Sequence, residues 1–372
     1  RTMGLAPETD PALDDGDSGR GVPNYVAGVA LDPQGSHLWV SSKKDNIFRG
    51  TSSVNDGQSL APDQTVRAIL SYIDVATGLE VPQNRIDLDN TAQLKAVAFS
   101  PLGDYVFATS QGNNELDIID DFSGELVGRQ AVGLAPDGFV IDPSANQIYI
   151  KNFTERTITV LDADSFFRLG ILPMPTIATI PTVYDEALSS EELLGLQIFY
   201  NAKDPRMSSE SYLSCASCHD AGGEDGRVWD FTDRGEGLRN TTTLLGSSAM
   251  RNGPVHWTGN FDEIQDFEHD IRDHFGGTGF LTDEQFNART TNTTLGDPKT
   301  GLSPDLDALA AYLASLNVVP RSPYRASDGS LTEDALAGRQ IYNSLNCATC
   351  HSGATTTDSA LGIRHDVGTI KS

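Results

Sequence analysis

Cysteine is scarce in this chain of 372 residues, and all four cysteines lie in two short Cys-x-x-Cys-His sequences. None is left for a structural disulfide or for a free nucleophile. Basic residues are also few, because 26 lysines and arginines stand against 52 aspartates and glutamates, for a formal net charge of -26. This balance argues against nucleic acid or an anionic membrane as the partner. It is typical of a soluble secreted protein or of a docking surface for a basic partner.

Long apolar runs are missing too. No stretch approaches the ~20 apolar residues of a membrane-spanning helix, and the chain starts at Arg1 without a basic and hydrophobic leader. We therefore expect a mature or trimmed piece without a membrane span. Its length exceeds that of most single domains, which predicts two or three units with separate cores.

Three segments in the first part of the chain share one pattern of a strand, a turn that contains proline, and a second strand. They cover residues 29–40, 97–107 and 139–150, and their prolines are spaced 68 and then 42 residues apart. One spacing suits a β-propeller blade of ~40–45 residues, and the other suits a blade with an insertion, at 52–64. We therefore expect residues 1–168 to be all-β.

These repeats resemble the Tyr-Val-Thr-Asn type of propeller repeat, although that tetrapeptide is absent. The segment has room for about three to four blades, whereas a closed propeller needs at least about four. We therefore expect further blades upstream of Arg1. A β-sandwich of similar strands is the alternative.

Helical signals follow a stretch without periodicity at 169–182, which predicts a linker. Ser189 and Glu192 form a capping box at the start of a helix, and its sequence returns later, because 195–201 matches 338–343. Each copy precedes a Cys-x-x-Cys-His sequence.

The C-terminal part is therefore expected to be all-α, with two cytochrome c-type haem units in tandem. They would span 183–319 and 320–372. Ser303 and Pro304 would begin the helix that closes the first unit. A linker at 169–182 would make the two parts of the chain separable.

The chemistry of the two motifs indicates covalent haem. Two thiols three positions apart can each form a thioether with a haem vinyl group, and the adjacent histidine then reaches the iron. A zinc site of four cysteines is the alternative, but it would not require histidine after both pairs. We therefore expect two haem c groups on Cys215, Cys218, Cys347 and Cys350, with His219 and His351 as proximal iron ligands. Covalent haem attachment takes place outside the cytoplasm, so a periplasmic or extracellular location is expected.

Other side chains that can ligate iron have less specific positions. His256, His269 and His274 follow the first motif and could approach the open face of its haem, although lone histidines are more often hydrogen-bonded or solvated. We expect structural roles for the remaining histidines and packing roles for two methionines of the first unit. These residues are His37, His365, Met207 and Met250.

A more specific pattern lies between the motifs, where 239–244 reads Arg-Asn-Thr-Thr-Thr-Leu and 253–261 reads Gly-Pro-Val-His-Trp-Thr-Gly-Asn-Phe. With these stretches, 183–372 resembles the bacterial di-haem cytochrome c peroxidases and their MauG-type relatives. The chain departs from the family pattern at Thr242, Thr258 and Asn260, where the family has Pro, Asp and Arg.

The resemblance implies functions for two further residues. Asn240 would help to hold Ca²⁺ between the haem units, and Trp257 would be an electron stepping stone between the haems. A loop-capping amide and a core aromatic are the alternatives.

The family's loop histidine, which closes the first haem, has no counterpart in residues 230–233. This departure favours a first haem that is open, as in the MauG branch, or that is closed by another residue. Only 21 residues follow His351, whereas the family needs a longer stretch there, so we expect the chain to be incomplete at both ends.

The resulting hypothesis is a peroxide-using di-haem oxidoreductase. The haem on His219 would be the reaction site, and the haem on His351 would relay electrons from a small redox protein. Glu268 and Arg272, at i and i+4, are the candidates for moving a proton and for stabilising the departing hydroxide, unless they form an ordinary surface ion pair.

Two alternatives stay open. The chain could be an electron-transfer cytochrome with two six-coordinate irons and a propeller that serves for docking. The propeller could instead bind a protein or polymer substrate.

Overall fold

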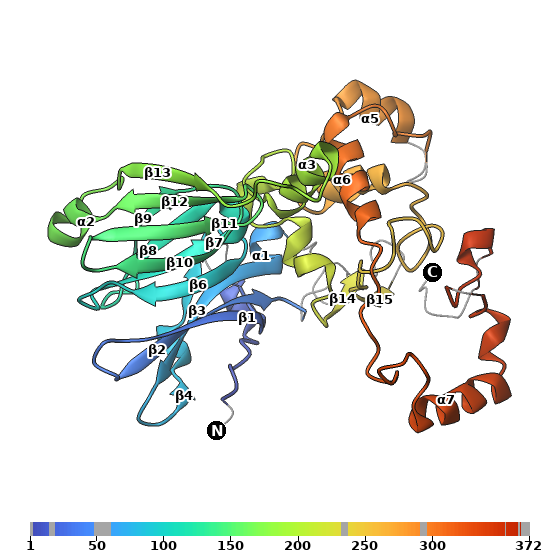
Figure 1. Ribbon diagram of the computed structural model, residues 1–372, viewed down its shortest axis with the longest axis horizontal. Helices are drawn as coiled ribbons and strands as arrows, with labels where there is room; N and C mark the ends of the chain where they lie inside the picture. Colours follow the sequence, from blue (N-terminus) through green and yellow to red (C-terminus); the bar gives the residue numbers. More distant parts are fainter. Residues whose placement is uncertain are drawn as a thin grey trace.

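The computed structural model describes residues 3–14, 19–47, 61–231, 237–290, 296–353, 355–363 and 365. Antiparallel sheets form the N-terminal half, and helices joined by long loops form most of the C-terminal half (Figure 1). In the described residues no helix has both the length and the apolar character needed to cross a membrane.

The first sheet has five antiparallel strands, and its order is β1-β2-β3-β4 with β5 also paired to β3. The short helix α1 leads directly into β3. The bounds are β1 (Val22–Leu31), β2 (His37–Asp45), α1 (Pro62–Thr65), β3 (Val66–Asp74), β4 (Leu79–Glu80) and β5 (Ile86–Leu88). The predicted insertion at 52–64 falls mostly outside the described residues, which resume at 61.

The second and third sheets each have four antiparallel strands in sequence order. Their bounds are β6 (Leu94–Phe99), β7 (Tyr105–Ser110), β8 (Glu115–Asp120), β9 (Leu126–Ala131), β10 (Pro136–Asp142), β11 (Gln147–Asn152), β12 (Thr157–Asp162) and β13 (Thr176–Pro181), with α2 (Asp164–Leu169) between β12 and β13. The first strands of successive sheets contact each other, β1 with β6 and β6 with β10. This is the arrangement of propeller blades, so the prediction of all-β, propeller-like blades is confirmed in the described residues.

Apolar side chains fill the space between neighbouring blades. Trp39 and Leu70 of the first sheet pack with Leu94 and Ile119 of the second. A separate cluster joins the second sheet to the third and includes Phe166 of α2. Because each blade buries its faces against the next, the stability of this half comes from neighbour contacts.

The predicted linker at 169–182 is wrong as a description of this segment. Residues 176–181 form β13, which pairs with β12 and completes the third sheet. Four of the five residues from Thr176 to Ile180 are β-branched, which favours a strand. The run has no polar and apolar alternation, however, and prolines lie at either end of it, so its residues show no strand period.

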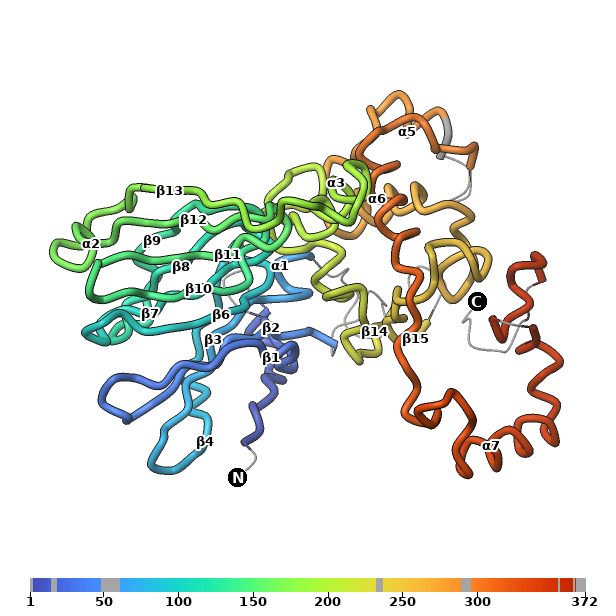
Figure 2. The backbone as a smooth tube through the Cα atoms, viewed as in Figure 1, coloured from blue at the N-terminus to red at the C-terminus, as the bar shows by residue number. Residues whose placement is uncertain are grey.

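Helices of the C-terminal half lie on one side of the blades. They are α3 (Ser190–Tyr200), α4 (Glu268–Asp273), α5 (Asp283–Thr290), α6 (Pro304–Ser315) and α7 (Glu333–Ser344). A hairpin of β14 (Val228–Phe231) and β15 (Gly237–Asn240) also belongs to this half, so the expectation of an all-α part is corrected to one of helices, long loops and a β-hairpin. Figure 2 shows that α7 lies apart from α3 and α6.

The helix starts agree with the sequence. Ser189 and Glu192 form both hydrogen bonds of the capping box, at 3.2 and 2.7 Å, and the hydroxyl of Ser303 accepts from the amide of Leu306 at 3.4 Å. Helices α3 and α6 cross closely at Gly195, where a Cβ atom would lie 1.9 Å from the carbonyl oxygen of Ala308. Glycine is therefore required for this crossing.

The two halves share apolar cores. Ala135 of the third blade is buried in the main helical cluster, and Val66 of β3 packs with Tyr212, Leu213 and Trp229. These contacts argue against the expectation that the halves are separable.

Candidate haem sites

The first motif begins in a 3-10 turn, η5 (Cys215–Ser217), which is spanned by a capping box between Ser214 and Ser217. The amide of His219 donates to the carbonyl of Cys215 at 3.0 Å and closes the turn. The Nδ1 of His219 lies 3.1 Å from the carbonyl oxygen of Gly223. A proton on Nδ1 would satisfy that contact and leave the Nε2 lone pair for iron.

The second motif repeats this geometry. It lies in η9 (Cys347–Thr349), the amide of His351 donates to the carbonyl of Cys347 at 3.0 Å, and its Nδ1 lies 3.1 Å from the carbonyl oxygen of Thr356. Both motifs therefore have the same backbone turn and the same contact of the histidine Nδ1 with a backbone carbonyl.

All four cysteines carry thiols in this structure, and these stand for the thioether sulfurs of a haem-loaded protein. Burial raises the pKa of the Cys215 thiol to about 12, with a smaller contribution from the carboxylate of Asp270. Burial also raises the pKa of Cys218, where Lys43 acts in the opposite direction. The pKa of His219 is lowered by burial, which keeps its imidazole neutral and able to bind iron.

Asp270 of α4 is the residue that sequence reasoning missed on this side of the motif. Its carboxylate lies 3.4 Å from Nε2 of His256 and 4.0 Å from Nε2 of His274. The ring of His256 packs against Phe261, with a centroid distance of 4.2 Å. Asp270 also acts electrostatically on Cys215. The i, i+4 spacing of Asp270 and His274 was the available signal, whereas His256 reaches the cluster through the fold.

His269, the third candidate of this segment, has different neighbours. Its Nδ1 lies 3.8 Å from the carboxylate of Asp273, and its ring packs against Phe286. The other histidines have carboxylate partners, at 3.1 Å for His37 with Asp121 and at 2.8 Å for His365 with Asp358.

The two methionines of the first unit also pack as expected. Met207 belongs to the buried helical cluster, and Met250 packs against that cluster from a partly buried position.

Glu268 and Arg272 come together as predicted, at 2.8 Å. The carboxylate of Glu268 is fully buried and also accepts from the amides of Phe280 and Leu281. At Gly279 a Cβ atom would lie 2.0 Å from Glu268 Oε1 and 2.2 Å from Arg272 Nε. This clamp on the loop around Gly279 favours a structural role for the pair over the predicted catalytic one.

Trp257 and Asn240 are also brought together, because the indole Nε1 of Trp257 donates to the backbone carbonyl of Asn240 at 3.0 Å. Trp257 is 56 % exposed, so it is not the core aromatic of the alternative interpretation. In the described part of the chain no group of three or more His, Cys, Asp or Glu side chains could hold a metal ion. The calcium role of Asn240 therefore stays a prediction. Residues 232 and 233, where the loop histidine is missing, lie outside the described residues.

The first blade also contacts the first motif. The hydroxyl of Tyr25 donates to the carbonyl of Cys218 at 2.8 Å. Lys43, whose side chain is fully buried, lies 2.8 Å from Asp45 and 3.7 Å from Asp225. Burial by itself would lower the pKa of Lys43, but the carboxylates of Asp45 and Asp225 raise that pKa, so the ammonium stays charged.

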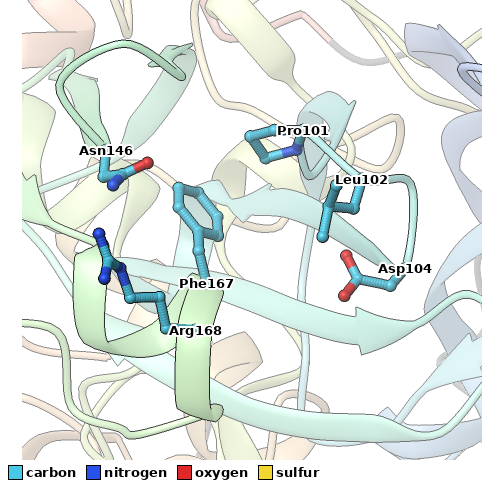
Figure 3. A pocket seen from close by; sticks show the side chains of 6 residues that line it. All are labelled: Pro101, Leu102, Asp104, Asn146, Phe167 and Arg168. Carbon is cyan, nitrogen blue, oxygen red and sulfur yellow. The ribbon is translucent and has the colours of Figure 1, made fainter.

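Two cavities lie in or beside the blades. One of about 260 Å³ lies where the blades meet the first motif, and its lining residues are Lys95, Gln111, Asp137, Phe153, Tyr200, Asp220 and Ala221. The other, of about 240 Å³, lies between the Pro101 turn and α2 (Figure 3). Figure 1 shows α2 at the end of the blades far from α3, so only the first cavity adjoins a haem motif.

Residues 189–296 match the family described as di-haem cytochrome c peroxidase. This segment carries a domain of that family. The match confirms the resemblance for these residues and includes the first motif. The second motif lies beyond the matched residues.

Two curated proteins are similar to part of the chain. Hydrazine synthase subunit gamma of Kuenenia stuttgartiensis is 32 % identical over 186 residues, which cover 46 % of this chain and 46 % of that protein. Cytochrome c peroxidase Ccp of Escherichia coli (strain K12) is 29 % identical over 183 residues, which cover 43 % and 36 %. The chain thus spans less than half the length of each of these relatives.

Solved structures give weaker likenesses. A structure of hydrazine synthase from Kuenenia stuttgartiensis has a TM-score of 0.33 and 18 % identity, and the match covers 37 % of this chain and 45 % of that one. The Dos1 propeller has a TM-score of 0.30 and 12 % identity, with 43 % and 34 % covered.

Proposed function

We propose that this chain is the di-haem part of a peroxidase-type oxidoreductase, with the haem on His219 as the reaction site and the haem on His351 as an electron relay. The observation that carries the proposal is the repeated turn, in which each motif presents two sulfurs and an imidazole whose Nδ1 faces a carbonyl. The family match over 189–296 supports peroxidase-type chemistry at the first motif. The similarity to hydrazine synthase subunit gamma leaves the substrate open.

When bound, haem c supplies the redox-active iron, and the residues around the first motif determine how it works. His219 provides the proximal nitrogen, and the contact of its Nδ1 with the carbonyl of Gly223 fixes the ring and makes the imidazole a stronger ligand. Asp270 lies beside His256 and His274 on the Cys215 side of the motif. A carboxylate between two imidazoles can take up a proton and return it, as peroxide cleavage requires. We assign this role to Asp270 in place of Glu268.

An electron-transfer cytochrome is the second candidate, and the same cluster favours it in one respect. The imidazoles of His256 and His274 both lie beside Asp270, and either would be a candidate for the distal ligand of the first haem. A distal histidine would make the iron six-coordinate and low-spin, and the protein would then transfer electrons without peroxide chemistry.

The absorbance spectrum of the haem-loaded ferric protein and its reaction with peroxide in stopped flow separate the two candidates. A high-spin band that disappears within seconds of adding peroxide supports the peroxidase type. We expect Asp270→Asn to slow that reaction by about 10²- to 10⁴-fold, the usual contribution of general acid–base catalysis. Asp358→Asn, which changes the aspartate beside His365, is the matched control and should leave the rate unchanged. Two low-spin, peroxide-inert haems would refute the peroxidase proposal and support the cytochrome.

Partners and location follow from charge and chemistry. With a net charge of -26, the surface attracts a basic electron donor, so we propose a small redox protein that reduces the haem on His351. The blades would bind a protein or polymer substrate. Covalent haem attachment supports a periplasmic or extracellular location.

A further inference from the structure

A buried charge cluster from the first blade lies against the first haem motif. Its members are Lys43 and Asp45 of β2, and Asp225 and Arg227 of the loop before β14. The side chains of Lys43, Asp45 and Asp225 are 0 % exposed. Arg227 donates to Asp45 at 3.2 Å, which links the loop to the blade. The cluster contains two cations and two anions, so its formal charge is zero.

Strand β1 is distorted where it meets the motif. Its pairing with β2 shifts register between Asn24 and Gly28, and Tyr25 has a φ of 48°, in the left-handed region that disfavours residues other than glycine. A bulge of this kind turns a side chain away from the regular pleat. Here it directs the Tyr25 hydroxyl to the carbonyl of Cys218 and places the Tyr25 ring 4.6 Å from Nζ of Lys43.

The bulge is held from both sides. Asn24 donates to Asp45 and to the backbone carbonyl of Asp225, both at 2.8 Å. The indole of Trp229 donates to the carboxylate of Asp225 at 3.1 Å. The blade is therefore attached to the motif through polar contacts of defined geometry. The ammonium of Lys43 lies beside three of the residues involved, which are Asp45, Asp225 and Tyr25. Lys43 and Asp225 act electrostatically, in opposite directions, on both Cys218 and His219.

We propose that Lys43 is an electrostatic residue of the first haem site, whose buried charge offsets those of Asp45 and Asp225, so that the reduction potential of the iron on His219 is higher than it would be without Lys43. A buried cation stabilises the reduced iron relative to the oxidised iron, and it does so strongly where water is excluded. The inference rests on the proposed function, since it requires haem at the first motif. It adds that the propeller half is part of that haem site.

The test is the reduction potential of each haem in the full-length, haem-loaded protein, measured by spectroelectrochemistry. Lys43→Met removes the charge and keeps much of the side-chain volume. At a fixed applied potential we expect the ratio of reduced to oxidised iron at the first haem to fall about tenfold, which equals about 59 mV for one electron. The second haem is an internal standard and should not change. Lys43→Arg keeps the charge and should stay near the wild-type value.

Lys151→Met is the matched control, because Lys151 is also a blade lysine with an aspartate partner, Asp137 at 2.9 Å, but its side chain is 60 % exposed. It should leave both potentials unchanged. Asp45→Asn removes a negative charge and should raise the first potential. The double change of Lys43→Met with Asp45→Asn should return it toward wild type, as expected for charges that act on one site.

Haem content, measured separately, keeps this proposal distinct from the proposed function. A wild type without haem at His219 refutes the proposed function itself. A fully loaded Lys43→Met protein with an unchanged first potential overturns the role of Lys43. If Lys43→Met fails to load haem, the Asp45→Asn variant is used instead. A raised reduction potential of its first haem supports the proposal, and an unchanged potential overturns it.

Discussion

The two Cys-x-x-Cys-His turns have the same backbone geometry but very different surroundings. In the first unit, α3 buries five of its residues and crosses α6, whereas none of the residues of α7 before the second motif is buried. Gly195 meets the backbone of α6, but its counterpart Gly338 has nothing within 4 Å of a Cβ position. Local sequence is therefore enough to set the turn, while packing from distant parts of the chain sets the environment of each histidine.

The different surroundings agree with the different functions that we propose for the two haems, a reaction site at the first motif and an electron relay at the second. Asp270 acts electrostatically on the first motif, and the first blade contacts the motif directly, so both bring charged groups near it. The second motif has polar contacts from its own segment, such as the hydrogen bond from the Tyr342 hydroxyl to the carbonyl of His351. An exposed haem suits electron exchange with a partner, and an enclosed one suits a reaction that excludes water.

The largest expected effect comes from removing either proximal histidine. His219→Ala should abolish normal ligation of the first haem only, and His351→Ala that of the second only, because each turn supplies its own imidazole. Haem quantitation and absorbance spectra measure this. A His219→Ala protein that kept both normal sets of bands would contradict the assignment of His219.

Gly195 of α3 and Gly338 of α7 occupy matching positions, so substituting each of them tests whether the two helices have different surroundings. Gly195→Ala should destabilise the first unit by about 3 kcal/mol or more, because the new methyl group overlaps the backbone of α6. Gly338→Ala should instead stabilise α7 by about 0.5–1 kcal/mol, since alanine costs less backbone entropy in a helix. Thermal unfolding followed by circular dichroism reports both, and equal shifts of the same sign would show that the two helices have similar surroundings.

Cyanide binding tests whether the first haem is open. No histidine stands at residues 230–233, where the peroxidase family places its closing ligand. The oxidised protein should therefore bind cyanide at the first haem without prior reduction. We expect its affinity there to be at least about tenfold higher than at the second haem, a difference of about 1.4 kcal/mol in binding free energy.

Alanine variants of His256, His269 and His274 complete the cyanide test. If the wild type is unreactive and one of these variants reacts, that histidine is a distal ligand and the open-site interpretation fails. The contacts of His256 and His274 with Asp270 make these two the more informative variants.

Sequence reasoning succeeded where the signal was local. The motif turns, the capping box at Ser189, the helix start at Ser303 and the paired strands around each proline turn depend on residues a few positions apart. The strand β13 was missed because its short run lies between prolines and does not alternate between polar and apolar residues. The electrostatic interaction of Lys43 with Cys218 had no signal at all, since these residues are about 175 positions apart in the sequence and their proximity depends on how blade and loop pack.

The smallest expected effect concerns two tyrosine hydroxyls that anchor the motifs. The hydroxyl of the buried Tyr200 accepts from the amide of Ala221 at 3.0 Å, two residues beyond His219, and Tyr342 donates to the carbonyl of His351 in a contact exposed to solvent. Tyr200→Phe should cost about 1 kcal/mol, because it leaves a partly buried amide without its acceptor. Tyr342→Phe should cost less than about 0.5 kcal/mol, since water can replace the lost donor. Unfolding temperatures of the two variants measure the difference, and haem content shows whether either motif still loads. A larger loss of stability for Tyr342→Phe than for Tyr200→Phe would mean that the second motif is enclosed in the haem-loaded protein. The difference in burial between the two units would then hold for the haem-free chain only.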